Sequence, residues 1–159
     1  MNETYFRIVL IEPEIPQNTG NIGRTCVATC SELHLVGELG FTIDDKQVKR
    51  AGLDYWPHLK LFRHASYADW MQKVEDPSRV FFFTTKTTQV YTKVQFKKGD
   101  WLVFGKETKG LAPEILQKFP QQNLTIPIIG PARSLNLATA VAIAAYEGVR
   151  QVHESAKPV

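Results

Sequence analysis

The sequence predicts an α/β protein whose mainly parallel sheet is flanked by helices. Two observations support this fold class. Runs rich in β-branched and aromatic residues alternate with segments that carry helix-start signals, as in βαβ units. The strongest runs, residues 5–11 (YFRIVLI) and 79–85 (RVFFFTT), are apolar over most of their length, which is typical of strands covered on both faces. No internal repeat, low-complexity tract or linker is visible in the sequence, so residues 1–159 are expected to form a single domain.

Each element follows from an apolar run or from a residue that favours a helix end. Asn18 and Ser66 are good helix N-caps, and Pro113 suits the first turn of a helix. Strands are therefore expected, in chain order, at residues 5–11, 33–36, 59–62, 79–85, 100–104 and 123–128. Helices are expected at residues 18–30, 66–74, 113–119 and 136–153, with one helical turn at residues 46–50 inside a long connection, residues 41–57.

The last expected helix has almost no polar face in its first half. Its residues 137–145 (LATAVAIAA) include a single hydroxyl-bearing side chain. A helix that is apolar all round is buried on more than one side. The second cover is either another subunit, which predicts a homodimer, or the long connection at residues 41–57.

Composition bounds the class of protein. Hydrophobic residues make up 43% of the chain and charged residues 22%, as in a soluble globular protein. The longest apolar stretch, residues 137–146, is far shorter than the roughly 20 residues of a membrane helix. The start of the chain lacks the pattern of a signal peptide, and Cys26 and Cys30 are its only cysteines, so a reduced, cytoplasmic location is expected. The net charge of +3 favours a polyanionic partner only mildly.

A metal site is not expected, although Cys26, Cys30 and His34 follow one another at intervals of four residues. His34 falls in an expected strand, and a fourth ligand is not evident in the sequence. Two small core residues on one helix face explain the cysteines better.

Three glycine-containing loops follow expected strands, at the sheet edge where α/β proteins bind ligands. The first, residues 18–24 (NTGNIGR), offers close backbone approach, helix N–H groups and the planar guanidinium of Arg24, all suited to phosphate. It lacks the G-x-G-x-x-G spacing of a dinucleotide fingerprint. A tight strand-to-helix turn with an exposed arginine is the alternative interpretation.

The second loop, residues 105–110 (GKETKG), starts like a P-loop. Leu111 and Ala112 stand where a P-loop has Lys and Ser or Thr, which excludes an NTPase site. A solvated charged turn is the simpler alternative. The third loop leads from residues 126–128 into Ser134 and Asn136, which suit the cap of the last helix. The sequence has no G-x-S-x-G elbow, so Ser134 does not indicate a hydrolase.

In this order and spacing, the three loops resemble the signature motifs of the SPOUT methyltransferases. The closer resemblance is to the small bacterial tRNA (cytidine/uridine) 2′-O-methyltransferases that modify the wobble nucleotide. It covers about residues 6–150. The segments that carry it are residues 12–24 (EPEIPQNTGNIGR), 52–56 (GLDYW), 104–110 (FGKETKG) and 126–127 (IP). Gly23 departs from the pattern, since a larger apolar residue is common there, and it is expected to loosen the first loop.

This resemblance implies a fold, a cofactor and a substrate. The C-terminal third of the sheet would be threaded into a trefoil knot that binds S-adenosyl-L-methionine, although general rules of chain topology disfavour knots. The substrate would be the anticodon stem-loop of tRNA, and the enzyme a homodimer. The residues implied in cofactor binding are Phe83, Thr84, Gly105, Glu107, Ile126, Ser134, Leu135 and Asn136.

The expected reaction transfers a methyl group to a ribose 2′-OH. Arg24 is expected to contact the substrate phosphate and polarise the hydroxyl, by electrostatic positioning more than by removing a proton. Asn18 and Ser134 would orient Arg24 or the ribose. Glu107 would shape the cofactor loop, within its own chain or across the dimer interface.

Basic and aromatic residues give candidates for contact with RNA, by binding phosphate or by stacking on a base. These candidates are Lys46, Arg50, Tyr55, Lys86, Lys106 and Arg133. An ordinary solvated surface is the alternative for them. Two further functions stay open: a related enzyme that methylates ribosomal RNA, a base or another tRNA site, and a non-catalytic RNA-binding module with a flavodoxin-like sheet.

Overall fold

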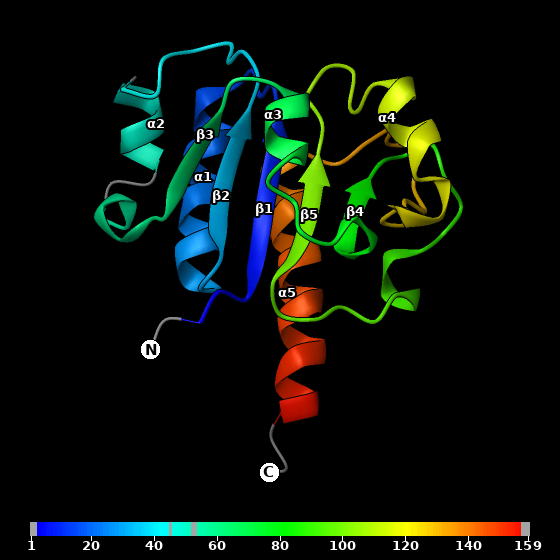
Figure 1. The fold of residues 1–159 in the computed structure, drawn as a ribbon. Helices are drawn as coiled ribbons and strands as arrows, with labels where there is room; N and C mark the ends of the chain where they lie inside the picture. The colour runs from blue at the N-terminus through cyan, green and yellow to red at the C-terminus, as the bar shows by residue number, and fades with distance from the viewer. Residues whose placement is uncertain (1–2, 45, 52–53, 157–159) are drawn as a thin grey trace.

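The computed structural model describes residues 3–44, 46–51 and 54–156. Its centre is a six-stranded sheet in the order β3-β2-β1-β5-β4-β6, and every pair of neighbouring strands is parallel (Figure 1). The strands are β1 (Phe6–Ile11), β2 (Glu32–Val36), β3 (Leu61–His64), β4 (Val80–Phe83), β5 (Asp100–Phe104) and β6 (Asn123–Leu124). The α-helices are α1 (Pro16–Ala28), α2 (Lys46–Ala51), α3 (Tyr67–Met71), α4 (Pro113–Lys118) and α5 (Leu137–Ala156). This arrangement confirms the predicted α/β class with a parallel sheet.

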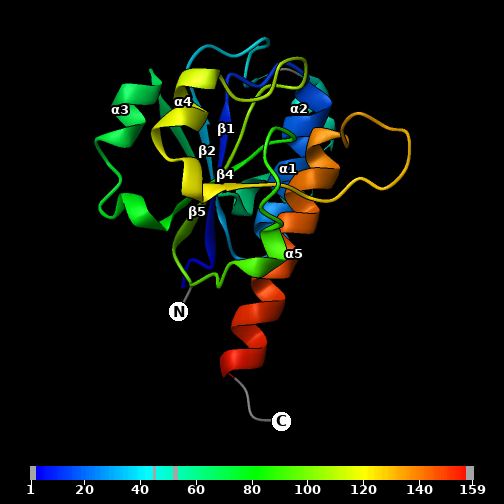
Figure 2. The same cartoon turned by 90° about the vertical axis from the view of Figure 1, so that its right-hand side faces the viewer.

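Helices cover both faces of the sheet. Figure 2 shows α1, α2 and α5 on one side and α3 and α4 on the other. Alternate residues of β1 enter two different hydrophobic clusters: Ile8 and Leu10 belong to one, Val9 and Ile11 to the other. Burial on both faces explains why the sequence of β1 is a continuous apolar run rather than an alternating one.

The strand order reverses direction between β1 and β5. From β1 the chain moves outward to β2 and β3, whereas β5, β4 and β6 lie on the other side of β1. The loops that leave the carboxyl ends of β1 and β5 therefore diverge. In open α/β sheets, such a switch point forms a crevice that binds ligands.

Several element boundaries differ from the prediction. The third strand is Leu61–His64 rather than residues 59–62, because residues just before it form a 3-10 helix, η1 (Trp56–His58). The last strand ends at Leu124, since Thr125 instead bonds to the backbone of Gln89 and Tyr91. The predicted helix at residues 66–74 is shorter, but Ser66 caps it as expected, accepting a bond from the Asp69 N–H at 3.1 Å.

The first helix begins at Pro16, and Ile15 rather than Asn18 stands at its N-cap position. The side chain of Ile15 cannot cap the helix, and Asn18 lies within the first turn, only 6% exposed. The prediction of an Asn18 cap was therefore wrong. A side chain from a distant loop supplies the cap, as described below.

One side of α5 faces the sheet and α1. Val141, Ala144 and Ala145 are fully buried, and a Cβ on Gly148 would lie 2.5 Å from Phe6 Cζ, so only glycine permits this approach. The opposite side is half-open, with Tyr146 50% exposed. The helix of the long connection, α2, packs closely on Gly20 of α1. Within the described part of the chain, no helix has the length and apolar character needed to cross a membrane.

A chain of polar contacts ties β2 to β3. The His34 Nε2–H donates to Glu32 Oε1 at 2.9 Å, and His34 Nδ1 then accepts from the Nε2–H of His64, also at 2.9 Å. His34 is 5% exposed, and burial lowers its pKa to about 4. Both histidines are consequently neutral at neutral pH. No group of three His, Cys, Asp or Glu able to hold a metal occurs among the residues that the structure describes.

The lowered pKa of His34 predicts that stability falls in mild acid. The unfolded chain takes up a proton near pH 6.5, whereas the folded chain resists it until about pH 4. Stability attributable to His34 is therefore complete above pH 6.5 and decreases below it, by at most about 1.4 kcal/mol per pH unit. The free energy of unfolding, measured with urea at several pH values in this range, should change less with pH for His34→Gln than for the unaltered chain. The exposed His58 gives the control, His58→Gln, which should keep this pH dependence; an unchanged pH dependence in His34→Gln would contradict the assignment.

Candidate functional site

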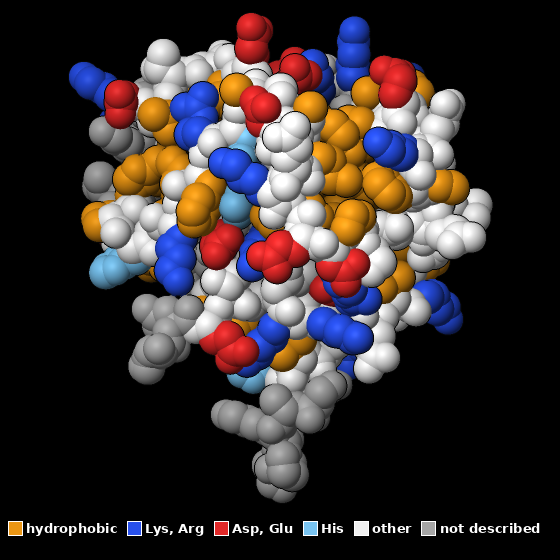
Figure 3. All heavy atoms as spheres, in the orientation of Figure 1, with side chains coloured by type: hydrophobic (Ala, Val, Ile, Leu, Met, Phe, Trp, Pro, Cys, Tyr) orange, Lys and Arg blue, Asp and Glu red, His pale blue; other side chains and the backbone are white. Residues whose placement is uncertain are grey.

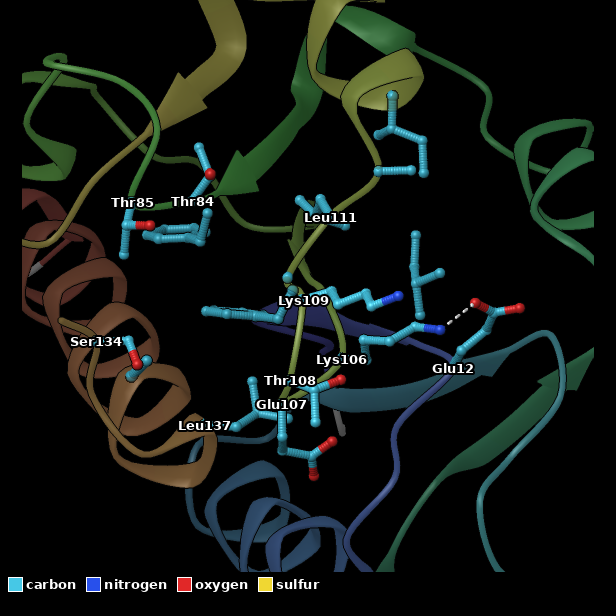
Figure 4. Close-up of a pocket in the computed structure, with 18 of the residues that line it drawn as sticks. Glu12, Thr84, Thr85, Lys106, Glu107, Thr108, Lys109, Leu111, Ser134 and Leu137 are labelled. Atoms are coloured by element: carbon cyan, nitrogen blue, oxygen red, sulfur yellow. Dashed lines mark ion pairs between the residues drawn. The ribbon is translucent and has the colours of Figure 1, made fainter.

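A pocket opens at the carboxyl ends of the strands, above the switch point between β1 and β5. Its volume is about 1310 Å³. Residues that follow all six strands form its walls, together with the starts of α3, α4 and α5. In Figure 4, Thr84 and Thr85 line it from the end of β4, and Ser134 and Leu137 line it from the side of α5.

The carboxylate of Glu107 caps the N-terminus of α1. Its Oε1 accepts the backbone N–H of Glu14 at 2.8 Å, and its Oε2 accepts the N–H of Ile15 at 3.0 Å. Oε2 also accepts from Asn18 Nδ2 at 3.2 Å. A negative charge at this position also interacts favourably with the helix dipole. The loop after β5 is thereby fixed to the helix that follows β1.

Asn18 extends this connection to the third loop. Its Oδ1 accepts from Asn136 Nδ2 at 3.1 Å, while Asn136 Oδ1 accepts the backbone N–H of Thr139 at 3.1 Å and so caps α5. The side chains of Glu107, Asn18 and Asn136 therefore form one chain of hydrogen bonds. We call this the Glu107–Asn18–Asn136 chain; it holds together the three loops that the sequence singled out.

A second set of contacts reinforces the first. Glu14 accepts from both the backbone N–H and the hydroxyl of Thr108, at 3.0 and 2.8 Å. These bonds lower the pKa of the Glu14 carboxyl. Lys106 Nζ lies 3.1 Å from Glu12 Oε1 (Figure 4). The loop after β5 is thus bonded to the segment after β1 at three consecutive residues.

Gly105 begins this loop and is required by its tight path. A Cβ on Gly105 would lie 2.1 Å from the carbonyl carbon of Gly110 and 2.3 Å from the Leu111 nitrogen. Gly110 itself has φ of 66°, a backbone conformation that favours glycine. The two glycines let the loop fold back on itself, which explains the pattern that resembled a P-loop.

The structure brings together most of the residues singled out from the sequence. All the expected cofactor-binding residues line this one pocket, as do three of the expected RNA contacts and Asn18. These pocket residues are Asn18, Phe83, Thr84, Lys86, Gly105, Lys106, Glu107, Ile126, Arg133, Ser134, Leu135 and Asn136. Their roles in binding stay predictions.

Arg24 lies outside the pocket. It is exposed on α1, and its guanidinium carbon lies 4.9 Å from the centre of the Tyr55 ring. The Asn18 side chain bonds to Glu107 and Asn136 instead. Within one chain, Asn18 therefore does not hold Arg24, which lies six positions further along α1; that Asn18 orients the ribose stays a prediction.

The remaining RNA candidates lie apart from the pocket walls. Lys46 and Arg50 are exposed on α2, and Tyr55 precedes η1. On the face that carries α3 and α4, Figure 3 shows basic side chains interspersed with acidic ones rather than gathered into one patch. The face drawn in Figure 3 therefore does not present a continuous basic patch that would attract RNA.

Glu12, Glu14 and Thr108 contribute to the site although the sequence analysis did not select them. Glu12 and Glu14 follow directly after an apolar strand, at the edge where ligand sites form, and this position was the available signal. Their pairing with Lys106 and Thr108 spans more than 90 residues and leaves no mark in the sequence.

Comparison with known proteins gives the site a family. The model of the SpoU rRNA Methylase family matches residues 5–146. The chain belongs to this family. A tRNA (cytidine(34)-2′-O)-methyltransferase of Aeromonas hydrophila is 49% identical over 146 residues, which cover 91% of this chain and 93% of the relative.

Solved structures agree with this family assignment. One, described as structural insights into the 2-OH methylation of C/U34 on tRNA, is 46% identical with a TM-score of 0.87, covering 92% of this chain and 89% of its own. The SpoU methyltransferase AviRb from Streptomyces viridochromogenes, in complex with the cofactor AdoMet, is 25% identical with a TM-score of 0.82. That match covers 94% of this chain and 58% of AviRb. The resemblance noted from the three loops is thus confirmed at the level of the family.

Proposed function

We propose that this protein transfers the methyl group of S-adenosyl-L-methionine to the ribose 2′-OH of cytidine or uridine at position 34 of tRNA. The observation that carries the proposal is the pocket held by the Glu107–Asn18–Asn136 chain. This pocket belongs to a protein that is nearly half identical in sequence, along most of its length, to a protein named for this reaction. Such a tRNA-modifying enzyme would act in the cytoplasm, as one methyltransferase domain comprising residues 1–159.

The pocket residues fit a nucleoside cofactor. Phe83, Ile126, Leu135 and Leu137 supply apolar surface for a purine ring, while Ser134 and the backbone near Gly105 supply polar groups. A volume of about 1310 Å³ exceeds the roughly 300–1,000 Å³ of typical small-ligand pockets, which leaves room for a substrate nucleotide as well. The cofactor, when bound, supplies the methyl group on a sulfonium.

The residues of the chain supply orientation and electrostatics. Methyl transfer needs the 2′-OH in line with the breaking bond, and fixing this geometry can account for many powers of ten in rate. Arg24 carries five N–H donors and keeps its proton, so it stabilises developing negative charge on the ribose and binds the phosphate rather than acting as a base. Lys86, Lys106 and Arg133, which line the pocket, bind the phosphates of the anticodon stem-loop.

A homodimer explains how Arg24 acts from outside the pocket of its own chain. Arg24 is exposed on α1, which packs beside α5. Next to it, α5 presents the half-exposed, mainly apolar Ala142, Ile143 and Tyr146. Covering this surface with a second copy buries the apolar side of α5 and carries Arg24 of one protomer to the pocket of its partner.

A C-terminal trefoil knot is also part of the proposal. It is supported by the family and by the path of the segment after β6. Thr125 bonds to Gln89 and Tyr91, so this segment runs along the loop that follows β4 before it turns into α5 (Figure 2). A threaded segment of this kind would keep the pocket loops from separating.

Ribosomal RNA is the second candidate substrate, and the description of the family as rRNA methylases favours it. The two substrates share cofactor, pocket and reaction. They differ in the nucleotide that receives the methyl group, so mapping that nucleotide separates them.

The first prediction concerns that nucleotide. Purified protein, labelled S-adenosyl-L-methionine and total RNA from a strain lacking the gene should give label in tRNA, in a 2′-O-methyl pyrimidine at position 34. The RNA is digested to nucleosides and the modified position mapped by mass spectrometry. Label confined to ribosomal RNA would favour the second candidate. RNA binding without turnover would indicate a non-catalytic module and contradict the proposed reaction.

The second prediction tests whether Arg24 acts across a dimer. Arg24→Ala should bind cofactor but keep only a small residual methylation rate. Thr85→Trp, whose side chain fills the pocket, should be inactive because it cannot bind cofactor. Refolding the two variants together at equal concentration should restore about a quarter of the unaltered activity, since half of the dimers then carry one complete site.

The control for this experiment is each variant refolded alone, which should keep its own low activity without any gain. If Arg24 acts on the pocket of its own chain, mixed dimers contain no complete site and mixing restores nothing. Near-normal turnover by Arg24→Ala alone would contradict the role of Arg24 altogether.

A further inference from the structure

Arg24 makes a stacking contact rather than an ion pair. Its guanidinium carbon lies 4.9 Å from the centre of the Tyr55 ring, within the range of a cation–π contact. Among the residues that the structure describes, no hydrogen bond or ion pair to Arg24 is present. A cation–π contact uses the charge of the guanidinium and does not require its N–H donors as hydrogen-bond partners.

Tyr55 is held in place by the 3-10 helix that follows it. The His58 N–H donates to the Tyr55 carbonyl at 2.9 Å, which starts η1. This short helix and Leu59 pack on α1 at Gly23: a Cβ there would lie 3.2 Å from Leu59 Cδ2 and 3.6 Å from Trp56 Cζ3. The residue just before Arg24 is therefore the point at which the Tyr55 segment docks.

This packing corrects the expectation for Gly23. The sequence suggested that a glycine at this position would loosen the first loop. Gly23 instead lies buried inside α1, and its missing side chain gives Trp56 and Leu59 room to approach the helix. The segment that contains Tyr55 thus packs on the helix one residue before Arg24.

We propose that Tyr55 is a positioning residue that holds Arg24 extended, with its edge donors directed toward the RNA substrate. This rests on the proposed function, in which Arg24 contacts phosphate and ribose. Fixing one rotamer of a long side chain before the substrate arrives removes an entropic cost from binding the transition state. Tyr55 therefore acts on the substrate through Arg24.

A double-mutant cycle tests this proposal. Tyr55→Ala should lower the single-turnover methylation rate about 2- to 5-fold, the range of an exposed cation–π contact, with little change in KM for tRNA. In an Arg24→Ala background, the same change should have no further effect. Tyr55→Phe retains the ring and should retain the coupling to Arg24. An equal loss in both backgrounds would show direct contact with RNA and overturn the proposal.

A spectroscopic measurement does not depend on turnover. In 15N-labelled protein, the Arg24 Nε–H resonance should be displaced by the ring current in the unaltered chain and in Tyr55→Phe, and should lose this displacement in Tyr55→Ala. An unmoved resonance in Tyr55→Ala would overturn the proposal. Absence of methyl transfer by the unaltered chain would instead overturn the proposed function, and the two failures are therefore distinguishable.

Discussion

The carboxylate of Glu107 at the start of α1 is the contact on which the site depends. It accepts the backbone N–H of Ile15, the N-cap residue of α1, whose own side chain makes no capping bond, and it does so from a loop 92 residues away. Through Asn18, the same carboxylate connects to Asn136, which caps α5. A helix cap is normally a local device that stabilises one helix. Here the contacts at the starts of two helices are joined, so the first turns of α1 and α5 are held at one side of the pocket by the same set of hydrogen bonds.

The topology of the sheet explains why this connection forms where it does. Because β1 and β5 are neighbours at the switch point, the loops that leave them meet above their carboxyl ends. The chain returns after β6 and passes the pocket again before α5 begins. Cofactor residues from four loops thus converge, while Arg24 stays outside on α1, where Tyr55 covers one face of its guanidinium. In the proposed function, the pocket would bind the cofactor, and Arg24 would reach the RNA from outside the pocket of its own chain.

The sequence predicted what depends on local patterns. The apolar runs located the strands, and Asn136 and Ser66 were recognised as caps because the cap residue and the helix adjoin. The three loops were found because their glycines and polar residues stand out locally. The start of α1 at Pro16 carries a local signal, a proline in the first turn, that was not used, and the later start of β3 follows from the neighbouring η1. The bonds of Glu107 to Ile15 and Asn18 depend on a distant loop and were not predictable. Asn18 and Arg24 lie on different sides of α1 because they are six positions apart in a helix, whereas the motif suggested a loop that would bring them together.

Calorimetric titration with S-adenosyl-L-methionine tests most directly whether the Glu107–Asn18–Asn136 chain assembles the pocket. Asn18→Asp keeps the size of the side chain but replaces the donor that faces Glu107 with a carboxylate, whereas Asn21→Asp makes the same chemical change at an exposed position of α1. The account predicts that Asn18→Asp loses about tenfold or more in affinity, as expected for losing a hydrogen bond to a charged group, and that Asn21→Asp loses little. A folded Asn18→Asp variant that binds the cofactor as tightly as the unaltered chain would contradict it.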